Sequence, residues 1–115
     1  MSSEQRDIAD GTLVVRTAKE GDTHVISLCG ELDLANASTA ETALEASLAE
    51  TASRVVIDMR ELEFIDSTGI ALLVAALGNN DGDERVRFIP SAAPAVTRVL
   101  ELTGLSERLP LADAS

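Results

Sequence analysis

The chain has 115 residues, of which 45% are hydrophobic and 25% are charged. This length predicts one domain, and this composition is that of a globular protein rather than a disordered one. The 9 basic and 20 acidic residues give a net charge of −11, so binding to nucleic acid or directly to an anionic membrane is not expected.

Histidine and cysteine each occur once, as His24 and Cys29. A single cysteine excludes an internal disulfide, and the two residues are too few for a zinc site, so no metal is expected. We expect Cys29 to be a small core residue and His24 to face solvent. No apolar run approaches the ~20 residues needed to span a bilayer, and the N-terminus lacks the pattern of a secretory signal. These features together predict a cytoplasmic protein.

The beginning of the chain predicts a hairpin. Residues 1–10 are polar and are expected to form a flexible tail. The β-branched content of residues 12–18 and 24–29 predicts two strands. The turn residues at 20–22 predict that these strands are antiparallel neighbours.

The middle of the chain predicts a helix and a buried strand. Apolar positions at helical spacing indicate a helix over about 35–50, with Asp33 or Asn36 as its N-cap. The continuous apolar run at 54–59 is typical of a central strand covered on both faces, which predicts a parallel crossover unit. Residues 60–66 are predicted to be a connection, with three packing side chains: Leu62, Phe64 and Ile65.

The rest of the chain predicts two more helices around one strand. Residues 67–77 have an apolar face at helical spacing, and the turn-like stretch 78–83 follows them. A strand over 85–89 precedes a helix that begins at Pro94 and ends at Gly104.

The predicted order of elements, ββαβαβα, defines an α/β fold. We expect a mixed sheet of four to five strands with helices packed mainly on one face. The single domain is predicted over residues 11–109, between an N-terminal tail at 1–10 and a C-terminal tail at 110–115. The last residues, from 109 on, are open between a short edge segment and a fragment of helix.

The most unusual local feature is Phe64-Ile65-Asp66-Ser67-Thr68-Gly69, in which polar residues follow an apolar pair and open a helix. Two interpretations of Ser67 stay open from the residues alone. Its hydroxyl caps the helix, or Asp66 takes that position and Ser67 faces outward as a phosphorylation site. A phosphate would add about −1.5 to −2 charges, which the helix dipole and free N–H groups favour, so we expect it to change docking rather than folding.

Catalysis is not expected. A nucleophilic Ser67 needs a base, but the single histidine lies in a distant strand and Gly-x-Ser-x-Gly is absent. The sequence contains no glycine-rich phosphate-binding loop, so no motif supports a nucleotide-binding role. Asp58 is interpreted as a strand-end residue partnered by Arg60. Asp33 and Asp66 are expected to approach each other at one end of the sheet, as an acidic patch for a partner or a weak cation site.

Several blocks at characteristic separations cover about residues 12–105, and these are Gly30–Asp33, Val55–Met59, Phe64–Gly69, Arg85–Phe88 and Val96–Leu105. In these blocks the sequence resembles the anti-sigma factor antagonists, the single-domain STAS proteins of bacterial partner-switching systems. The Asp-Ser-Thr-Gly element is the most specific part of the likeness.

The resemblance implies a mechanism. The unmodified protein binds an anti-sigma factor that is also a serine kinase, and so frees a sigma factor for transcription. The kinase uses ATP to phosphorylate the serine after the aspartate, which corresponds to Ser67, with Thr68 as the second candidate. The phosphoprotein releases the kinase, and a metal-dependent serine phosphatase restores the unmodified form. ATP and magnesium then belong to the partners, and this chain needs no cofactor.

The interface implied by this reasoning has Ser67 as its switch and contains no catalytic residue. Its expected members are Asp33, Asn36, Asp66, Ser67, Thr68 and Gly69. The sequence departs from many relatives at Ile70-Ala71, where they carry Leu-Gly, and this bears on partner choice. The alternatives are a STAS interaction subunit of a membrane transporter or lipid-transport complex, without phosphate on Ser67, and a nucleotide-binding domain.

Overall fold

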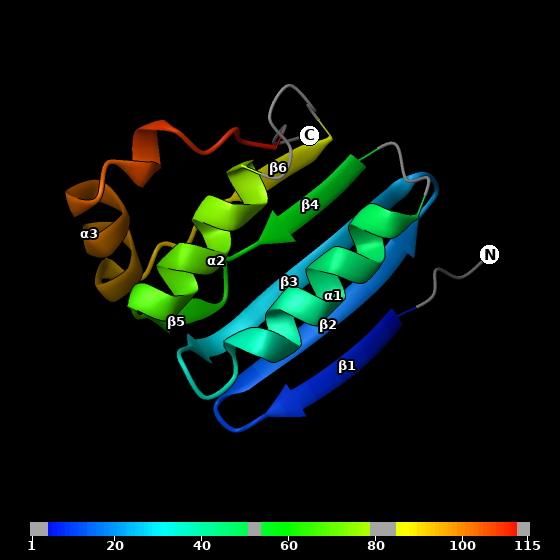
Figure 1. The fold of residues 1–115 in the computed structure, drawn as a ribbon, viewed down its shortest axis with the longest axis horizontal. Helices are drawn as coiled ribbons and strands as arrows, with labels where there is room; N and C mark the ends of the chain where they lie inside the picture. The colour runs from blue at the N-terminus through cyan, green and yellow to red at the C-terminus, as the bar shows by residue number, and fades with distance from the viewer. Residues whose placement is uncertain (1–4, 51–53, 79–84, 113–115) are drawn as a thin grey trace.

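The computed structural model describes residues 5–50, 54–78 and 85–112, and Figure 1 shows how its elements are arranged. The strands are β1 (Gln5–Asp10), β2 (Leu13–Glu20), β3 (Thr23–Leu32), β4 (Arg54–Asp58), β5 (Leu62–Ile65) and β6 (Val86–Ile89). The helices are α1 (Ala37–Ala49), α2 (Ser67–Gly78) and α3 (Pro94–Leu102), followed by a 3-10 turn at Leu105–Glu107. The predicted turn at 78–83 lies, after its first residue, outside the described residues.

The strands form one six-stranded mixed sheet in the order β1-β2-β3-β4-β6, with β5 paired to β3. β1, β2 and β3 are antiparallel neighbours, whereas the pairs β3–β4, β3–β5 and β4–β6 are parallel. Residues 23–27 of β3 pair with β4, and residues 30–32 pair with β5. The predicted α/β class and its mixed sheet are therefore confirmed, but the sheet has six strands rather than the predicted four to five, because β1 and β5 were not expected.

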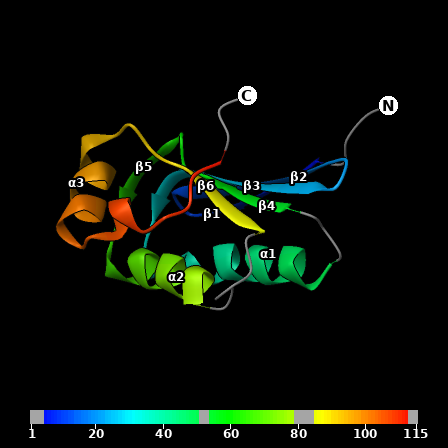
Figure 2. The ribbon, with the colours of Figure 1, turned by 90° about the horizontal axis from the view of Figure 1, so that it is seen from above.

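The helices lie mainly on one face of the sheet. Figure 2 shows α1 and α2 side by side below the sheet, whereas α3 lies at one end of it, next to β5. The core fills the layer between the sheet and the two helices, because alternate residues of each strand point to the same face. Its largest fully buried strand side chains include Leu13, Ile26 and Phe88.

The N-terminal segment is more ordered than the sequence predicts. Residues 5–10, which we expected in a flexible tail, form β1 and pair with β2 along its whole length. The sequence did not predict this strand because its side chains are mostly exposed. Residues 5–9 are exposed and only Asp10 is half-buried. With so little burial, the strand carries none of the apolar alternation from which half-buried strands are predicted.

The segment between β4 and α2 also differs from the prediction. Residues 62–65 form β5 rather than an irregular connection. Leu62 and Ile65 pack in the core as expected, but Phe64 is 43% exposed, so its assignment as a packing residue is wrong. A four-residue strand with buried ends and an exposed middle shows neither period 2 nor a continuous apolar run, and its pairing with β3 is what defines it.

The end of the described chain is attached to the sheet. Leu111 forms a parallel bridge with Phe88. The Phe88 N–H donates to Pro110 O at 2.8 Å, and the Ala112 N–H donates to Phe88 O at 2.9 Å. Of the two possibilities left open for the tail, the edge segment is therefore the one that forms, and it covers the outer edge of β6.

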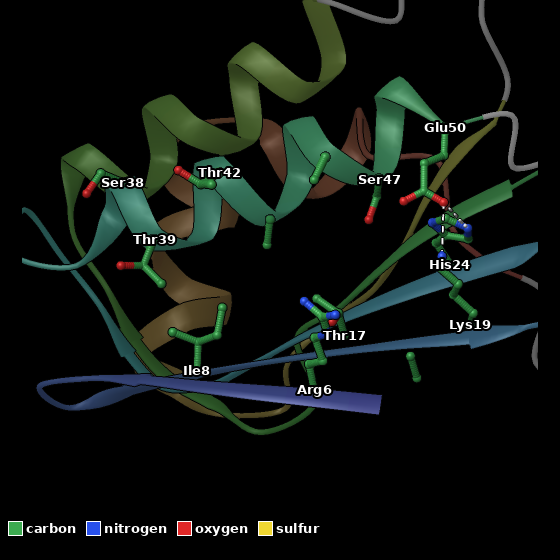
Figure 3. Close-up of a pocket in the computed structure, with 13 residues that line it drawn as sticks. Arg6, Ile8, Thr17, Lys19, His24, Ser38, Thr39, Thr42, Ser47 and Glu50 are labelled. Carbon is green, nitrogen blue, oxygen red and sulfur yellow. Dashed lines mark ion pairs between the residues drawn. The ribbon is translucent and has the colours of Figure 1, made fainter. Parts of the chain in front are cut away.

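Two side chains of β3 point to the opposite faces of the sheet from those that we expected. His24, predicted to face solvent, is 8% exposed, and its Nε2 lies 3.6 Å from Glu50 Oε1 at the end of α1 (Figure 3). Cys29, predicted in the core, is only half-buried and lies outside the core cluster. Since Val25 and Cys29 give the outer face of β3 an apolar character too, the sequence does not reveal which face is inside.

Candidate functional site

The site is centred on the start of α2, directly after β5. Ser67 is the first residue of this helix and is exposed. Its hydroxyl makes no hydrogen bond to any residue that the structure describes. The chain on both sides of it is fixed, because Ile65 is buried in the core on one side and Gly69 is buried on the other. The serine is thus presented to solvent from a fixed position in the chain.

Asp66 is the N-cap of α2. Its Oδ1 accepts hydrogen bonds from the backbone N–H groups of Thr68 at 2.9 Å and Gly69 at 3.1 Å. These are two of the donors that the start of a helix leaves without an intrahelical partner. The carboxylate therefore performs the capping that a serine hydroxyl would otherwise provide, and the Ser67 hydroxyl stays unbound within the described chain.

The second oxygen of Asp66 reaches the loop between β3 and α1. Oδ2 accepts a hydrogen bond from the Leu34 N–H at 3.2 Å. The parallel pairing of β3 with β5 makes this contact possible, because it brings the carboxyl ends of the two strands to the same edge of the sheet. The two segments that carry Asp33 and Asp66 therefore lie side by side, as expected. The bond that joins them runs from the backbone N–H of Leu34 to the Asp66 carboxylate.

Asn36 holds the shape of this loop. Its side chain is 2% exposed, Oδ1 accepts from the Asp33 N–H at 2.9 Å and Nδ2 donates to Glu31 O at 3.0 Å. The Asp33 carboxylate accepts from the Ala35 N–H at 3.0 Å. Asn36 is the N-cap residue of α1, one of the two predicted, but neither its side chain nor that of Asp33 caps the helix, because the amide and the carboxylate are bonded inside the loop. With the loop fixed in this way, Leu34 is left 77% exposed.

Gly69 allows α2 to pack closely against the sheet. A Cβ added at this position would lie 2.5 Å from Ile65 Cγ1 and 3.0 Å from Leu32 Cδ2. Gly69 thus allows the backbone of α2 to approach the chain's own strands closely. The result is a helix start that is held against β3 and β5 without a side chain between them.

Exposed apolar side chains stand on the segments next to Ser67 in the fold, and sequence reasoning did not find them. Leu34 on the loop, Phe64 on β5 and Val74 on α2 are 77%, 43% and 42% exposed. The helix α2 contains no charged residue, and its exposed side also presents Ala71 and Ala75. Apolar side chains exposed on adjoining segments are candidates for an interaction surface. One available signal was the large apolar residue at position 34, in the loop between Asp33 and Asn36.

The N–H groups expected to receive a phosphate are largely occupied, because Thr68 and Gly69 already donate to Asp66. A phosphate on Ser67 would therefore stand beside the Asp66 carboxylate rather than replace it. Like charges at this distance repel, which offsets the favourable effect of the helix dipole. We therefore expect a phosphate here to act mainly on the charge of the surface rather than on the fold.

Asp58 is a structural residue at the end of β4, as predicted. Arg60 donates to its carboxylate from the backbone N–H at 3.0 Å and from Nη2 at 2.8 Å. Burial opposes ionisation of this carboxyl, but the hydrogen bonds from Arg60 outweigh it and lower the pKa of Asp58 below its usual value. On the same face of the sheet, burial raises the pKa of the Cys29 thiol.

Neither a metal cluster nor a membrane-spanning helix is found among the residues that the structure describes. No group of three His, Cys, Asp or Glu side chains is placed to hold a metal ion there. Within those same ranges, no helix combines the length and hydropathy needed to cross a bilayer.

The arrangement is that of a small α/β binding domain with a capped helix start that presents a serine. The family model described as "Mlab, STAS domain" matches residues 15–112, and the chain therefore belongs to the STAS domain family. The chain is 33% identical over 100 residues to the anti-sigma-F factor antagonist RsfB of Mycobacterium tuberculosis, which covers 86% of this chain and 80% of RsfB.

Solved structures agree with this assignment. An anti-sigma factor antagonist from Mycobacterium paratuberculosis superimposes with a TM-score of 0.79 at 28% identity, over 90% of this chain and 87% of that one. The Bacillus protein SpoIIAA shares the fold alone. Its unphosphorylated form has a TM-score of 0.65 at 18% identity, over 98% of this chain and 90% of that one. Its phosphorylated form has a TM-score of 0.57 at 17% identity, over 98% and 93% of the two chains.

Proposed function

We propose that this protein is an anti-sigma factor antagonist whose unphosphorylated form binds an anti-sigma factor with serine kinase activity and thereby frees a sigma factor. Phosphorylation of Ser67 releases the kinase. The observation that carries the proposal is the exposed Ser67 hydroxyl, left unbound within the described chain because Asp66 caps the helix in its place. The names of the relatives support the antagonist role and do not favour the transport-subunit alternative.

The docking surface of this proposal consists of the start of α2 and the loop between β3 and α1. Leu34 and Val74 supply exposed apolar area, and Asp33 and Asp66 supply charge at its edge. Asn36 and Gly69 are buried, so they contribute by fixing the backbone on which the contact residues stand. The apolar side chains then provide binding free energy, and the polar ones provide orientation.

Phosphorylation weakens this interface through charge. The phosphate adds about −1.5 to −2 charges beside Asp66, in the middle of a surface that has to be desolvated on binding. Each ~1.4 kcal/mol of repulsion or unpaired burial lowers affinity tenfold. Two such increments already lower affinity about 100-fold, which is enough to exchange one partner for another without a change of fold.

Ser67 is a better acceptor than Thr68. Ser67 is exposed, whereas Thr68 is half-buried and its backbone N–H is bound to Asp66. A kinase needs the hydroxyl in its own active site, so the exposed residue is reached without opening the helix. Thr68 stays the second candidate.

The chemistry of the cycle belongs to the partners. The kinase supplies ATP and magnesium, and a metal-dependent serine phosphatase removes the phosphate. This chain acts as a binding protein rather than an enzyme, and as a regulator of transcription we place it in the cytoplasm.

The test is phosphorylation by an anti-sigma factor kinase of the same organism, followed by mass spectrometry of the intact protein. We expect one phosphate on the wild type and on Thr68→Ala, and none on Ser67→Ala. Binding of the kinase to the unmodified and the phosphorylated protein is then compared by calorimetry, with a loss of about 100-fold expected. A phosphate that persists in Ser67→Ala, or equal affinity of the two forms, would show the proposal to be wrong.

A further inference from the structure

The two outer edges of the sheet differ in the part of the chain that the structure describes. The edge of β6 is covered by residues 110–112, which bond to Phe88. No described segment pairs with the outer edge of β1, and Figure 1 shows this strand at the margin of the sheet. A strand with a free edge presents a row of unpaired backbone N–H and C=O groups, which is a template for pairing with another strand.

Three of the six residues of β1 are charged, which is a common protection of such an edge, but other features leave the strand open to pairing. It is six residues long and contains no proline, and Ile8 at its middle is 48% exposed. On the side of α1 it borders a groove of about 550 Å³ (Figure 3). Arg6 and Ile8 point into this groove, across from Thr39 and Thr42 of α1. No described residue forms an ion pair with Arg6.

The charge pattern of β1 is complementary to itself. If two copies pair antiparallel with Ile8 opposite Ile8, then Arg6 of each copy stands opposite Asp10 of the other. Asp7, which is already bonded to Arg16 of its own chain, then faces Ala9. Opposite charges across antiparallel strands stabilise the pair, and an apolar pair lies between them.

Other registers are worse. A slip by one residue would set side chains of different faces opposite each other. The next permitted registers centre on Asp7 or on Ala9. The first places Asp7 opposite Asp7, and the second places Ile8 opposite Asp10. A parallel arrangement in register would stack like charges along the strand.

We propose that β1 is a self-association surface, through which two copies of this chain form an antiparallel β1–β1 pair centred on Ile8. The sheet then continues across a two-fold axis, with α1 of both copies on the same side. The two grooves merge into one trough over the paired strands, and the Ile8 side chains meet on its floor. Local Arg6–Asp10 pairs counter the repulsion that a net charge of −11 per chain would otherwise cause.

This surface is separate from the switch. Ser67 follows β5, which lies on the far side of β3 from β1 and β2. Self-association therefore leaves the start of α2 accessible, and each proposal can fail while the other stands.

The first test is sedimentation velocity from micromolar to millimolar concentration at physiological ionic strength. We expect the wild type to dimerise with rising concentration and Ile8→Lys to stay monomeric, with unchanged circular dichroism. The matched control is Leu34→Lys, which places the same charge on the loop between β3 and α1, within the docking surface for the kinase. This variant is expected to dimerise like the wild type while losing kinase binding. A wild type that is monomeric throughout overturns the proposal. The partner of the β1 edge would then have to be a strand of another protein.

A charge exchange tests the register. Arg6→Glu alone and Asp10→Lys alone each set two like-charged pairs across the strands, and each is expected to self-associate at least about tenfold more weakly. Mixed together, they restore both opposite pairs and form a heterodimer. Asp10→Lys also removes the hydrogen bond that Thr39 Oγ1 donates to Asp10. Thr39→Val removes the same bond without changing the charge, so it is the control and should dimerise normally. A mixture no stronger than its components overturns the register.

Disulfide trapping gives an independent readout. In a Cys29→Ala background, Ile8→Cys is expected to form a covalent dimer on oxidation, because the two side chains are directly opposite. Ala9→Cys is expected to cross-link far more slowly, since its cross-strand neighbour is Asp7. The reverse order of rates would show that the strands pair in the register centred on Ala9.

Discussion

Removing the Asp66 carboxylate is the perturbation that tests the architecture of the site most directly. Asp66→Ala deletes the two capping bonds to Thr68 and Gly69 and the bond to the Leu34 N–H. Loss of an N-cap costs about 1 kcal/mol. The bond to Leu34 adds about 0.5 kcal/mol, at the low end of the range for a hydrogen bond, because this exposed amide is readily solvated. We therefore expect a loss of about 1.5 kcal/mol in the free energy of unfolding.

Asp66→Asn separates the two contributions. An asparagine oxygen caps a helix about as well as a carboxylate, so the bonds to Thr68 and Gly69 survive. Its amide nitrogen then faces the Leu34 N–H, and two donors cannot bond to each other. We expect this variant to lose only about 0.5 kcal/mol.

The assay is urea unfolding followed by circular dichroism, with Tm measured in parallel. A loss of 1.5 kcal/mol corresponds to a fall in Tm of about 6 °C for a domain of this size. Glu63→Ala is the matched control, since it removes the same charge from an exposed position on β5 and should stay within about 0.5 kcal/mol of the wild type. If Asp66→Ala costs no more than Glu63→Ala, the carboxylate does not organise the site as described.

Three further substitutions probe the switch, the packing and the acid response. Ser67→Asp should unfold within about 0.5 kcal/mol of the wild type in urea, yet bind the kinase at least about tenfold more weakly by calorimetry, and retained affinity would contradict the charge mechanism. Gly69→Ala should cost about 1 kcal/mol or more in urea unfolding, because its methyl group would lie 2.5 Å from Ile65 Cγ1, and a stabilised variant would refute this packing. The lowered pKa of Asp58 stabilises the fold above the carboxyl's unfolded pKa, and this contribution is lost as pH falls through the folded pKa. Asp58→Asn should therefore show a flatter dependence of stability on acid pH than the wild type, and equal slopes would mean that the pair with Arg60 contributes nothing.

The helices, and the strands that pack on them, could be predicted from sequence because their signals are local. The position of α2 follows from its apolar residues, although Val74, which their spacing places on the buried face, is 42% exposed. The start of α3 follows from Pro94. The exposed serine could also be anticipated, since an aspartate directly before it competes for the cap. These features depend on neighbours within four residues, which is the range over which sequence patterns are informative.

The remaining features depend on contacts between distant segments. β1 was missed because an edge strand with exposed side chains needs no apolar alternation. β5 was missed because its pairing with β3 defines it, across 32 residues from Gly30 to Leu62. That same pairing brings Asp66 to Leu34, so one unrecognised strand concealed both a sheet element and the second half of the site.

The distance between the two proposed surfaces decides whether they act on each other. From β1 to β5 the sheet crosses β2 and β3, which are three strand spacings or about 14 Å. Exposed charges further apart than the Debye length of about 8 Å at physiological ionic strength are largely screened. A phosphate on Ser67 therefore has little electrostatic effect on the Arg6–Asp10 pairs, and pairing at β1 changes nothing at the α2 start. Phosphorylation would select the partner at one side of the sheet while self-association sets the number of copies at the other.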